Sequence, residues 1–250
     1  MALLATDAIV LHAFDYLESS RILRLVTRDG GVRSALAKGA RRSSRRFGSA
    51  VDLFAQGSAQ LYAKPGRDLD TLSAFDVVLA RPALAADLGR FTGASAIAEL
   101  TLRFGRDAAD AGLFDAVADA FDALAAAASD AALTATLASA WRIVVELGFA
   151  PAVDVCGDCH LPLEREVTVM FSHRAGGALC ARCGRLAPAG RKLPPEARDA
   201  LRGFLLGVPG EALDDASARA HQRLLREFLD EHLTDGRPLR ALELWEVQRW

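Results

Sequence analysis

The four cysteines of the chain form two Cys-X2-Cys pairs, made by Cys156 with Cys159 and by Cys180 with Cys183. Two such pairs, joined by a loop of about 20 residues, have the spacing of a four-thiolate zinc site, in which each pair closes one side of a tetrahedral ion. The alternative is two disulfides, which require an oxidising compartment. Because the first residues lack the basic start of an export signal, we expect reduced thiols that bind one structural Zn²⁺ ion.

The expected zinc ion is structural rather than catalytic, because a catalytic site keeps one position open for water. His160 and His173 are close enough in sequence to replace a thiolate, but four cysteines already fill the shell. A zinc deaminase or hydrolase would show His-X-Glu with Pro-Cys-X-X-Cys, or His-Glu-X-X-His, and the sequence contains neither pattern. Phosphate-loop, dinucleotide-binding and nucleophile-elbow motifs are also missing. These patterns favour a binding protein over an enzyme.

A second candidate site is a run of basic residues in the first third of the chain. Between Gly30 and Val51 there is no acidic residue, and there are six basic ones: Arg33, Lys38, Arg41, Arg42, Arg45 and Arg46. Basic side chains at this density neutralise phosphates and bind nucleic acid without reading its sequence. The alternative is a solvated surface loop whose charge only aids solubility.

The basic run lies within a region that alternates like a set of short strands. The pattern predicts strands at 6–14, 21–27, 32–38, 51–62 and 71–78, with turn signals at 29–31 and 64–68. Five strands of this size suggest an OB-fold barrel, which commonly binds single strands. In the fourth strand, alternation predicts one apolar face and one face that carries Phe54, Gln56, Ser58, Gln60 and Tyr62. Phe47, Phe54 and Tyr62 either stack bases or pack in the core, and the sequence leaves both possibilities open.

From Arg81 onward the spacing becomes helical, and Pro82 suits the first position of a helix. We expect helices at about 83–104, 108–128, 131–148, 195–207 and 216–233, and from 238 to the end. The predicted fold is therefore an α+β multidomain protein. It has a five-stranded OB-fold β-barrel at 1–80 and a mostly α-helical domain at 81–250, with an inserted four-cysteine zinc module at about 154–187.

Composition gives no sign of a membrane protein, because the chain is 51% apolar and 25% charged and its longest apolar runs are shorter than a span. We expect a cytoplasmic protein with no membrane partner. The net charge of −2 divides into +3 for residues 1–80, −4 for 81–150 and −1 for 151–250. The positive charge is thus concentrated in the predicted barrel.

Several short segments follow one another in a characteristic order. They are Glu18-Ser19-Ser20, Ala37-Lys38-Gly39-Ala40-Arg41-Arg42, Glu146-Leu147-Gly148-Phe149-Ala150-Pro151, the four cysteines, and His232-Leu233 with Arg237-Pro238-Leu239. In these segments the chain resembles the bacterial recombination mediator RecO over essentially its whole length, most specifically at 37–42. One departure is 41–46, where the family often has a proline and a lysine.

The resemblance implies a protein that binds single- and double-stranded DNA without catalysis, anneals complementary strands and associates with the nucleoid. It also implies a RecR-type partner, contact between the helical domain and the C-terminal tail of SSB, and help in loading RecA. The family motif places DNA contacts on Lys38, Arg41 and Arg42, whereas charge and strand alternation add Arg33, Arg45, Arg46 and Tyr62.

For the SSB tail, Arg142 beside Trp141 is the candidate, the alternative being that Trp141 is core and Arg142 a surface charge. The competing function is a zinc-stapled OB-fold transcription or RNA-binding factor. Such a factor would use the same barrel but would prefer one sequence or RNA.

Overall fold

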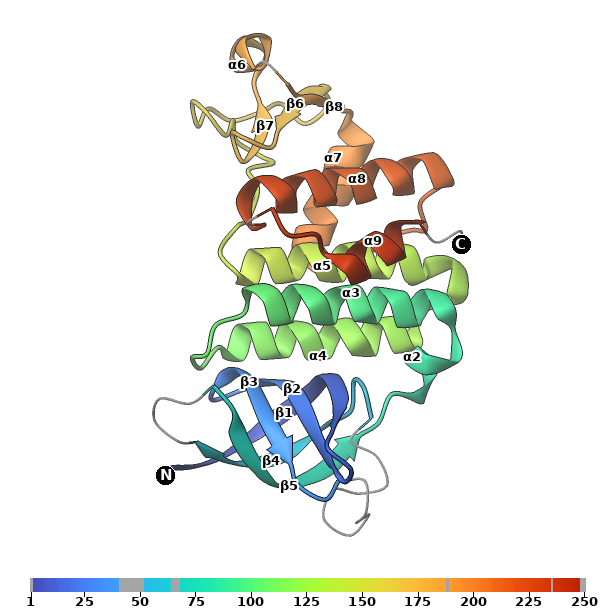
Figure 1. The fold of residues 1–250 in the computed structure, drawn as a ribbon. Coiled ribbons are helices and arrows are strands. Elements are labelled where there is room, and N and C mark those ends of the chain that lie inside the picture. The colour runs from blue at the N-terminus through green and yellow to red at the C-terminus, as the bar shows by residue number, and fades with distance from the viewer. Residues whose placement is uncertain (1, 41–51, 64–67, 188, 235, 248–250) are drawn as a thin grey trace.

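The computed structural model describes residues 2–40, 52–63, 68–187, 189–234 and 236–247. The chain forms a β-barrel, a stack of helices, and a small module that holds the cysteines. Figure 1 shows the barrel and this cysteine module, residues 152–193, at opposite ends of the helical stack. The described residues contain no helix that is long and apolar enough to span a membrane.

The barrel consists of β1 (Ala2–Tyr16), β2 (Ser20–Thr27), β3 (Gly31–Ala37), β4 (Gln56–Ala63) and β5 (Asp70–Leu79). The strands close in the order β1-β2-β3-β5-β4, with β4 pairing back to β1. Only β3 and β5 pair in parallel; the other pairs of the barrel are antiparallel. This closed barrel confirms the predicted five-stranded N-terminal fold.

The fourth strand begins later than predicted, at Gln56 rather than at residue 51. From there the alternation holds, because Ala59 and Leu61 are buried in the barrel while Gln60 and Tyr62 face outward. Phe54 precedes the strand, has a left-handed φ of 69°, and is only 2% exposed. The prediction that Phe54 lies on the outer face of the strand is therefore wrong, because the backbone turns before the pairing starts.

Helices α2 (Pro82–Ala86), α3 (Leu88–Phe104), α4 (Ala111–Ala126) and α5 (Ala132–Glu146) follow the barrel, with a 3-10 turn, η1 (Ser129–Ala131), before α5. The predicted helix 83–104 is interrupted at one residue, since the extended backbone of Asp87 ends α2 and its side chain accepts a hydrogen bond from the backbone N–H of Arg90. Asp110 caps α4 in the same way. These Asp caps satisfy N–H groups that a helix start leaves unpaired.

One continuous apolar core joins the barrel to the helices. Ile9, Leu11, Val26 and Phe54 are buried and belong to the same cluster as the interior of α3, α4 and α5. A separate cluster fills the barrel itself and includes Val10, Leu23, Leu25, Leu61 and Phe75. Since β1 is buried on both faces around Ile9, the barrel is packed onto the helices rather than tethered to them.

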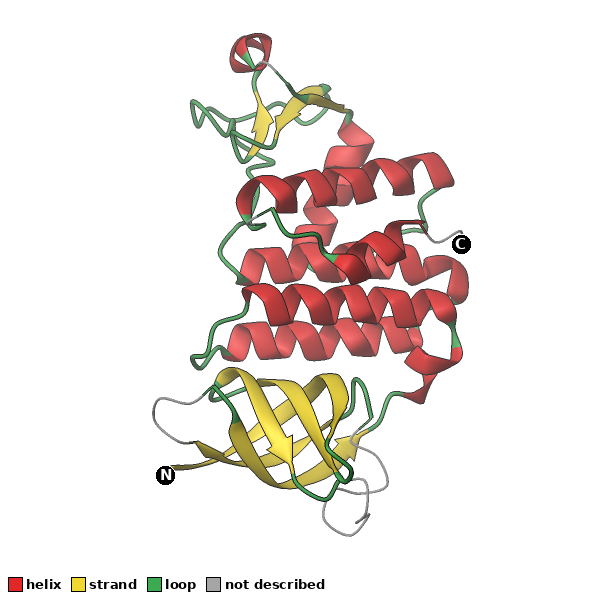
Figure 2. Cartoon of the chain, in the orientation of Figure 1, coloured by secondary structure: helices red, strands yellow, loops and turns green. Residues whose placement is uncertain are grey.

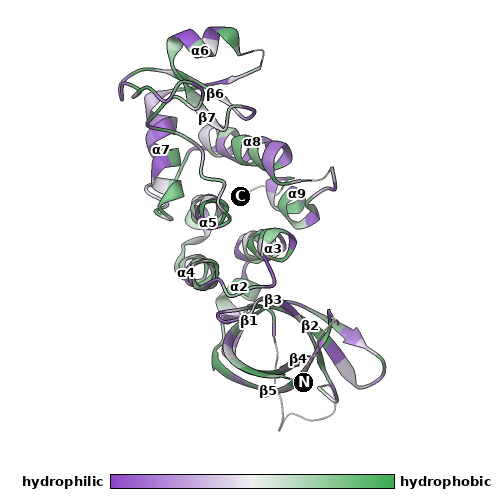
Figure 3. Ribbon diagram, turned by 90° about the vertical axis from the view of Figure 1, so that its left-hand side faces the viewer, coloured by the Kyte–Doolittle hydropathy of each residue, from purple (hydrophilic) through white to green (hydrophobic). Residues whose placement is uncertain are grey.

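The C-terminal part adds α7 (Pro195–Leu205), α8 (Asp215–His232) and α9 (Arg240–Val247) to the stack. The cysteine module contains β6 (Val169–Ser172), β7 (Gly177–Leu179), α6 (Ala181–Leu186) and β8 (Arg191–Leu193), and its sheet has the order β7-β6-β8. Figure 2 shows that helices dominate between the barrel and this small sheet. Figure 3 looks along α3, α4 and α5 and shows them layered between the barrel and α7 with α8.

Candidate metal centre and nucleic-acid interface

The four cysteine sulfurs converge in the cysteine module, with one Sγ atom from each residue and all within 4.8 Å of one another. The Sγ atoms of Cys159 and Cys180, one from each pair, are 3.8 Å apart. In a tetrahedron with metal–sulfur bonds of about 2.3 Å, neighbouring sulfurs are about 3.8 Å apart. The donor set therefore fits one tetrahedral thiolate-bound metal ion.

Local backbone structure presents each pair of thiols. In the first pair, the N–H of Cys156 bonds to the carbonyl of Leu161, and the N–H of His160 bonds back to the carbonyl of Cys156, both at 2.8 Å. The second pair lies at the start of α6, where Cys180 is the N-cap residue and Cys183 is in the first turn. The two parts meet where Ala152 bridges Gly177 and the N–H of Ala178 donates to the carbonyl of Ala152 at 2.7 Å. Glycine permits this close approach, because a Cβ atom at residue 177 would lie 2.2 Å from that carbonyl oxygen.

The backbone around the thiols favours ionised sulfur at one position. Burial acts to raise the pKa of Cys156, but hydrogen bonds from backbone N–H groups, including those of Cys159 and Cys180, outweigh it and lower this pKa to about 6. Thiolate is the form of cysteine that binds metal ions. Cys156 is thus prepared to bind a cation at neutral pH.

The cysteine module is anchored to α7 and α8 by polar contacts that are partly buried. Arg198 on α7 is fully buried and donates from Nη2 to the carbonyl oxygens of Glu164 and Arg165, at 2.6 and 2.9 Å. Glu227 on α8 pairs with His173 of the module at 2.9 Å and with Arg191. The module is therefore fixed against the helices at several points rather than through one linker.

On the barrel, the structure brings Lys38 and Tyr62 to one outer surface. Leu36, Thr71 and Tyr62 lie side by side across β3, β5 and β4 and all face outward. Two strand spacings make this row about 10 Å wide, and Lys38 continues the outward face of β3. Lys38 and Tyr62 are exposed. Together with Leu36 and Thr71 they form what we call the barrel surface. In the sequence, Lys38 is followed by the basic residues of 41–46, which we call the basic segment.

Comparison with known proteins gives the chain a family. Residues 1–81 match the profile described as Recombination protein O N terminal, and residues 85–243 match the profile described as Recombination protein O C terminal. The "DNA repair protein RecO" of Anaeromyxobacter sp. (strain K) is 38% identical over 239 residues, covering 93% of this chain and 92% of that protein. The protein of that name from Anaeromyxobacter sp. (strain Fw109-5) is 35% identical and covers 95% of this chain. This chain belongs to the RecO family. It therefore has a role in DNA repair and recombination, as the resemblance in the sequence implied.

Not all predicted DNA contacts of this RecO-family chain come together. Arg41, Arg42, Arg45, Arg46 and Phe47 lie outside the described residues. Arg33 shares strand parity with the buried Ala35 and Ala37, not with the barrel surface. Its Nε donates to the carbonyl of Gly30 at 2.9 Å, and its guanidinium lies 3.9 Å from the buried carboxylate of Asp70. Arg33 thus balances an internal charge, and its DNA contact stays a prediction.

The predicted partner site at Trp141 and Arg142 is divided between core and surface. Trp141 is fully buried on α5, and its ring centroid lies 5.2 Å from that of Phe228 on α8. Arg142 is partly exposed and pairs with Glu146 one turn later. The groove beside Arg142 also contains Asp115 and Asp119. Carboxylates around the arginine disfavour an acidic ligand, and partner binding here stays a prediction.

Sequence reasoning missed two arginines that fix the barrel on α4. Arg81 is almost fully buried; it donates to a side-chain oxygen of Asp122 at 2.7 Å, to the carbonyl of Phe54 at 2.9 Å and to Gln56 at 2.9 Å. Arg28, just after β2, pairs with Asp115 and lies over the ring of Phe114. Asp115 and Asp122 are two turns apart on α4. The dipeptide Phe-Asp occurs twice on α4, at 114–115 and again seven residues later at 121–122. This repeat is a weak sequence signal that the helix makes two similar contacts.

Proposed function

We propose that this chain is a non-catalytic DNA-binding recombination mediator. It binds single- and double-stranded DNA without sequence preference, anneals complementary strands, and, with a RecR-type partner, helps to load RecA onto SSB-coated single strands. The observation that carries the proposal is the closed five-stranded barrel in a chain that matches the family over both of its parts. Barrels of this type commonly bind nucleic acid on an outer strand face.

The DNA interface in this proposal is the barrel surface together with the basic segment 41–46. Lys38 and Tyr62 supply a phosphate contact and an aromatic face, and the two residues lie on one side of the barrel. Asp7 and Asp76 are register partners of Ser58, at the other end of β4, whereas Asp70 directly precedes Thr71, the register partner of Tyr62, and is buried beside Arg33. In this proposal a strand passes Tyr62 and Lys38, and its phosphates contact the basic residues 41–46.

The metal in this proposal is one structural Zn²⁺ ion held by Cys156, Cys159, Cys180 and Cys183. Four thiolates leave no open position for water, so the ion stabilises the cysteine module and takes no part in chemistry. Two further contacts belong to the proposal: the RecR-type partner, and the SSB tail on the helical domain. Family membership is what supports proposing both.

A salt titration tests the DNA interface. If about four basic side chains contact phosphates of a single strand, log affinity should fall against log salt with a slope of about −3, at roughly −0.7 per contact. Replacing Arg41 and Arg42 by Ala removes two of these contacts, so it should weaken binding to all sequences alike and flatten this slope by about 1.4 units. Fluorescence anisotropy with labelled oligonucleotides measures both quantities.

The matched control is the Arg21→Ala, Arg28→Ala protein. It also loses two barrel charges, but both arginines already pair with carboxylates, of Asp15 and Asp115. The control should keep the wild-type slope. If the Arg41, Arg42 variant and the control both keep the wild-type slope and affinity, the basic segment does not bind DNA. A strong preference for RNA or for one sequence would instead favour a transcription or RNA-binding factor.

A further inference from the structure

The outer face of β1 carries three aromatic side chains in a row. His12, Phe14 and Tyr16 are two residues apart, about 6.8 Å along an extended strand, and all three are exposed. Phe14 is 42% and Tyr16 41% exposed, and the ring centroids of His12 and Phe14 are 5.8 Å apart. We call these three residues the β1 face. The DNA interface proposed above does not include them.

A β-bulge turns these rings outward. The pairing of β1 with β2 shifts between Val10 and His12, so that Leu11 is an extra residue. Before the bulge, Ala8 and Val10 belong to the barrel core, and after it Ala13 packs against that core. Without the extra residue, strict alternation would direct residues 12, 14 and 16 into the barrel. Bulges re-aim side chains in this way and are common beside functional sites.

The β1 face is continuous with the barrel surface. Strand pairing places Phe14 opposite Ile22 of β2, and Ile22 opposite Leu36 of β3. From Leu36 the row continues through Thr71 to Tyr62. Four strand spacings make this row about 19 Å long around the barrel. Exposed aromatic residues therefore lie at both of its ends.

A groove of about 620 Å³ runs from the β1 face to the helical stack, where α3 and the start of α9 line it. Its basic residues are Arg24 of β2, Arg103 of α3 and Arg240 of α9. Among the described residues that line it, the one carboxylate is that of Glu99, which accepts hydrogen bonds from two backbone N–H groups at the start of α9. Arg240 is exposed and forms no ion pair with another described residue. The groove is therefore net positive and attracts phosphate groups.

The negative charge closest to Phe14 in sequence lies on the other side of the strand. Asp15 alternates with Phe14 and Tyr16, so it points to the opposite face of β1, and it pairs with Arg21 at 3.1 Å. Asp52 lines the same small hollow as Asp15 and Arg21. The phosphates of a strand bound on the β1 face would therefore lie toward the groove and not toward this hollow.

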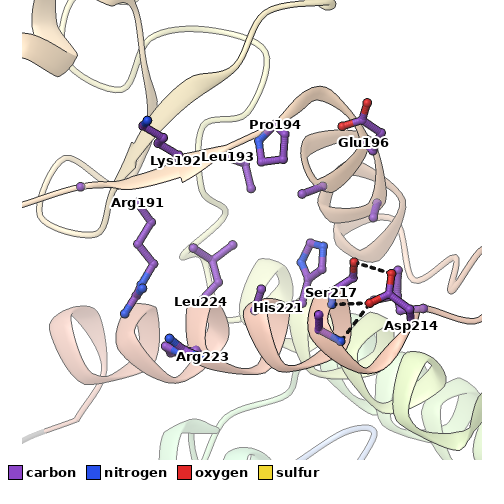
Figure 4. Close-up of a pocket in the computed structure, with 16 residues that line it drawn as sticks. Arg191, Lys192, Leu193, Pro194, Glu196, Asp214, Ser217, His221, Arg223 and Leu224 are labelled. Carbon is purple, nitrogen blue, oxygen red and sulfur yellow. Dashed lines mark hydrogen bonds between the residues drawn. The ribbon is translucent and has the colours of Figure 1, made fainter.

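The cavity beside α8 shows that an arginine in a hollow is not sufficient to attract a polyanion. This cavity, of about 880 Å³, lies between α8 and the segment that joins β8 to α7. Figure 4 shows Arg191 and Arg223 at one end and Glu196 with Asp214 at the other, with His221 between them. Its charges oppose one another. The groove beside β1, by contrast, combines net positive charge with exposed aromatic rings.

We propose that the β1 face and this groove bind single-stranded DNA, with bases stacked on Phe14 and Tyr16 and phosphates on the three arginines of the groove. The proposal rests on the proposed function, that the chain binds DNA, and adds a contact away from the basic segment. Single-strand binders combine a positive groove with aromatic rings because every base has a flat face that stacks. An acidic peptide would also suit the arginines, but continuity with the barrel surface favours a DNA strand.

Oligonucleotide binding by the full-length protein, measured by fluorescence anisotropy, tests the β1 face. Phe14→Ala and Tyr16→Ala should each weaken binding of a single strand about 5- to 150-fold, the effect of losing one stacked base. The salt slope should stay unchanged, because no charge is removed. Phe14→Leu keeps an apolar side chain but lacks the flat ring, so it should lose nearly as much affinity. The matched control is Phe149→Ala, which removes a ring of similar exposure (37%) after α5 and should bind as wild type does.

The groove and duplex DNA give two independent measurements. Arg240→Ala should flatten the slope of log affinity against log salt by about 0.7, the value of one phosphate contact. Its control is Arg219→Ala, an exposed arginine on α8, which should leave the slope unchanged. Phe14→Ala and Tyr16→Ala should weaken binding of duplex DNA little, because its bases are already paired and stacked on one another.

The β1 face is excluded as a DNA contact if wild type binds single strands and Phe14→Ala, Tyr16→Ala and Arg240→Ala bind them equally well; the proposed function then still stands. It is also excluded if Phe149→Ala loses as much affinity as Phe14→Ala, or if Phe14→Ala weakens binding of an SSB-tail peptide and not of the oligonucleotide. Wild-type protein that binds no oligonucleotide would instead overturn the proposed function itself. Should Phe14→Ala fail to fold, Tyr16→Ala at the end of the hairpin and Arg240→Ala still decide the outcome.

Discussion

Comparing Arg81→Ala with Arg28→Ala should show how much more a buried arginine contributes to the free energy of unfolding than an exposed one at the same interface. The side chain of Arg81 is 2% exposed and connects three parts of the molecule: Asp122 on α4, the carbonyl of Phe54 and the amide of Gln56. Arg28 makes the analogous contact with Asp115, but both partners are substantially exposed. The two arginines thus form a matched pair.

The free energy of unfolding that Arg81→Ala should lose follows from the three hydrogen bonds of the arginine. One hydrogen bond to a charged group contributes about 1.5–3 kcal/mol, and two to neutral acceptors contribute about 0.5–1.5 kcal/mol each. The sum is about 2.5–6 kcal/mol, and because the Asp122 side chain is 54% exposed and stays solvated without Arg81, we expect a loss of about 3–4 kcal/mol, in the lower half of that range. Arg28→Ala should have a small effect, because solvent and salt screen an exposed pair.

Urea unfolding followed by tryptophan fluorescence measures the difference. With a slope of about 3 kcal/mol per molar urea, Arg81→Ala should lower the midpoint by at least about 1 M. Arg81→Lys, which keeps the charge but has fewer donors in fixed geometry, should lie between Arg81→Ala and wild type. Equal midpoints for Arg81→Ala and Arg28→Ala would refute the argument, because burial would then have no influence on the value of the contact.

Three further predictions concern the rest of the molecule. Cys156→Ser should lose the proposed metal ion and unfold the cysteine module, because structural zinc contributes on the order of 10 kcal/mol in isolated fingers. Metal analysis should show that zinc is lost, and oligonucleotide anisotropy should show that DNA binding at the barrel is kept. His221, whose pKa burial lowers to about 4, binds its proton more readily in the unfolded chain. Stability should therefore fall by about 3 kcal/mol as pH drops from 6.5 to 4, and His221→Phe should lack this loss. Measuring both proteins at each pH cancels the opposite effect of Glu246, whose pKa burial raises to about 7. Arg142→Glu tests the predicted partner site: because the groove beside Arg142 already contains carboxylates, we expect this variant to bind an SSB-tail peptide as tightly as wild type. A large loss of affinity in calorimetry would instead support the predicted site at Arg142.

Periodicity predicted the barrel well because the strands are amphipathic, and it failed where the chain bends. Ala59, Leu61 and Tyr62 lie on the faces that alternation assigns. Phe54 does not, since the left-handed backbone at this residue puts its ring between Phe91 and Phe121, with centroid distances of 6.0 and 4.9 Å. Nothing in the local sequence marks that bend. The cysteine cluster, by contrast, was predictable because metal ligation itself dictates the spacing.

Grouping residues by charge alone was less reliable than following strand parity. Arg33 was placed with Lys38 because no acidic residue separates them in sequence, yet they differ by an odd number of positions and so face opposite sides of β3. The buried partner of Arg33, Asp70, comes from another strand. Arg81 was equally invisible, since Gln56 and Asp122 lie 25 and 41 residues away from it. Contacts of this kind depend on tertiary structure, which one sequence does not display.

The barrel and the cysteine module are anchored to the helical stack by different arginines, Arg81 and Arg198, so damage to one anchor does not remove the other. Arg81 holds the barrel to α4, and Arg198 holds the module to α7, at opposite ends of the helical stack (Figure 1). Within the described part of the chain, the hydrogen bonds of Arg198 go to Glu164 and Arg165 and not to the barrel. Loss of the proposed metal ion would therefore have to act on the proposed DNA interface through α5, α7 and α8, whose interior is one apolar cluster. Because a packed interior resists partial change, loss of the proposed metal ion should leave the salt dependence of DNA binding at the barrel unchanged until the helices themselves unfold.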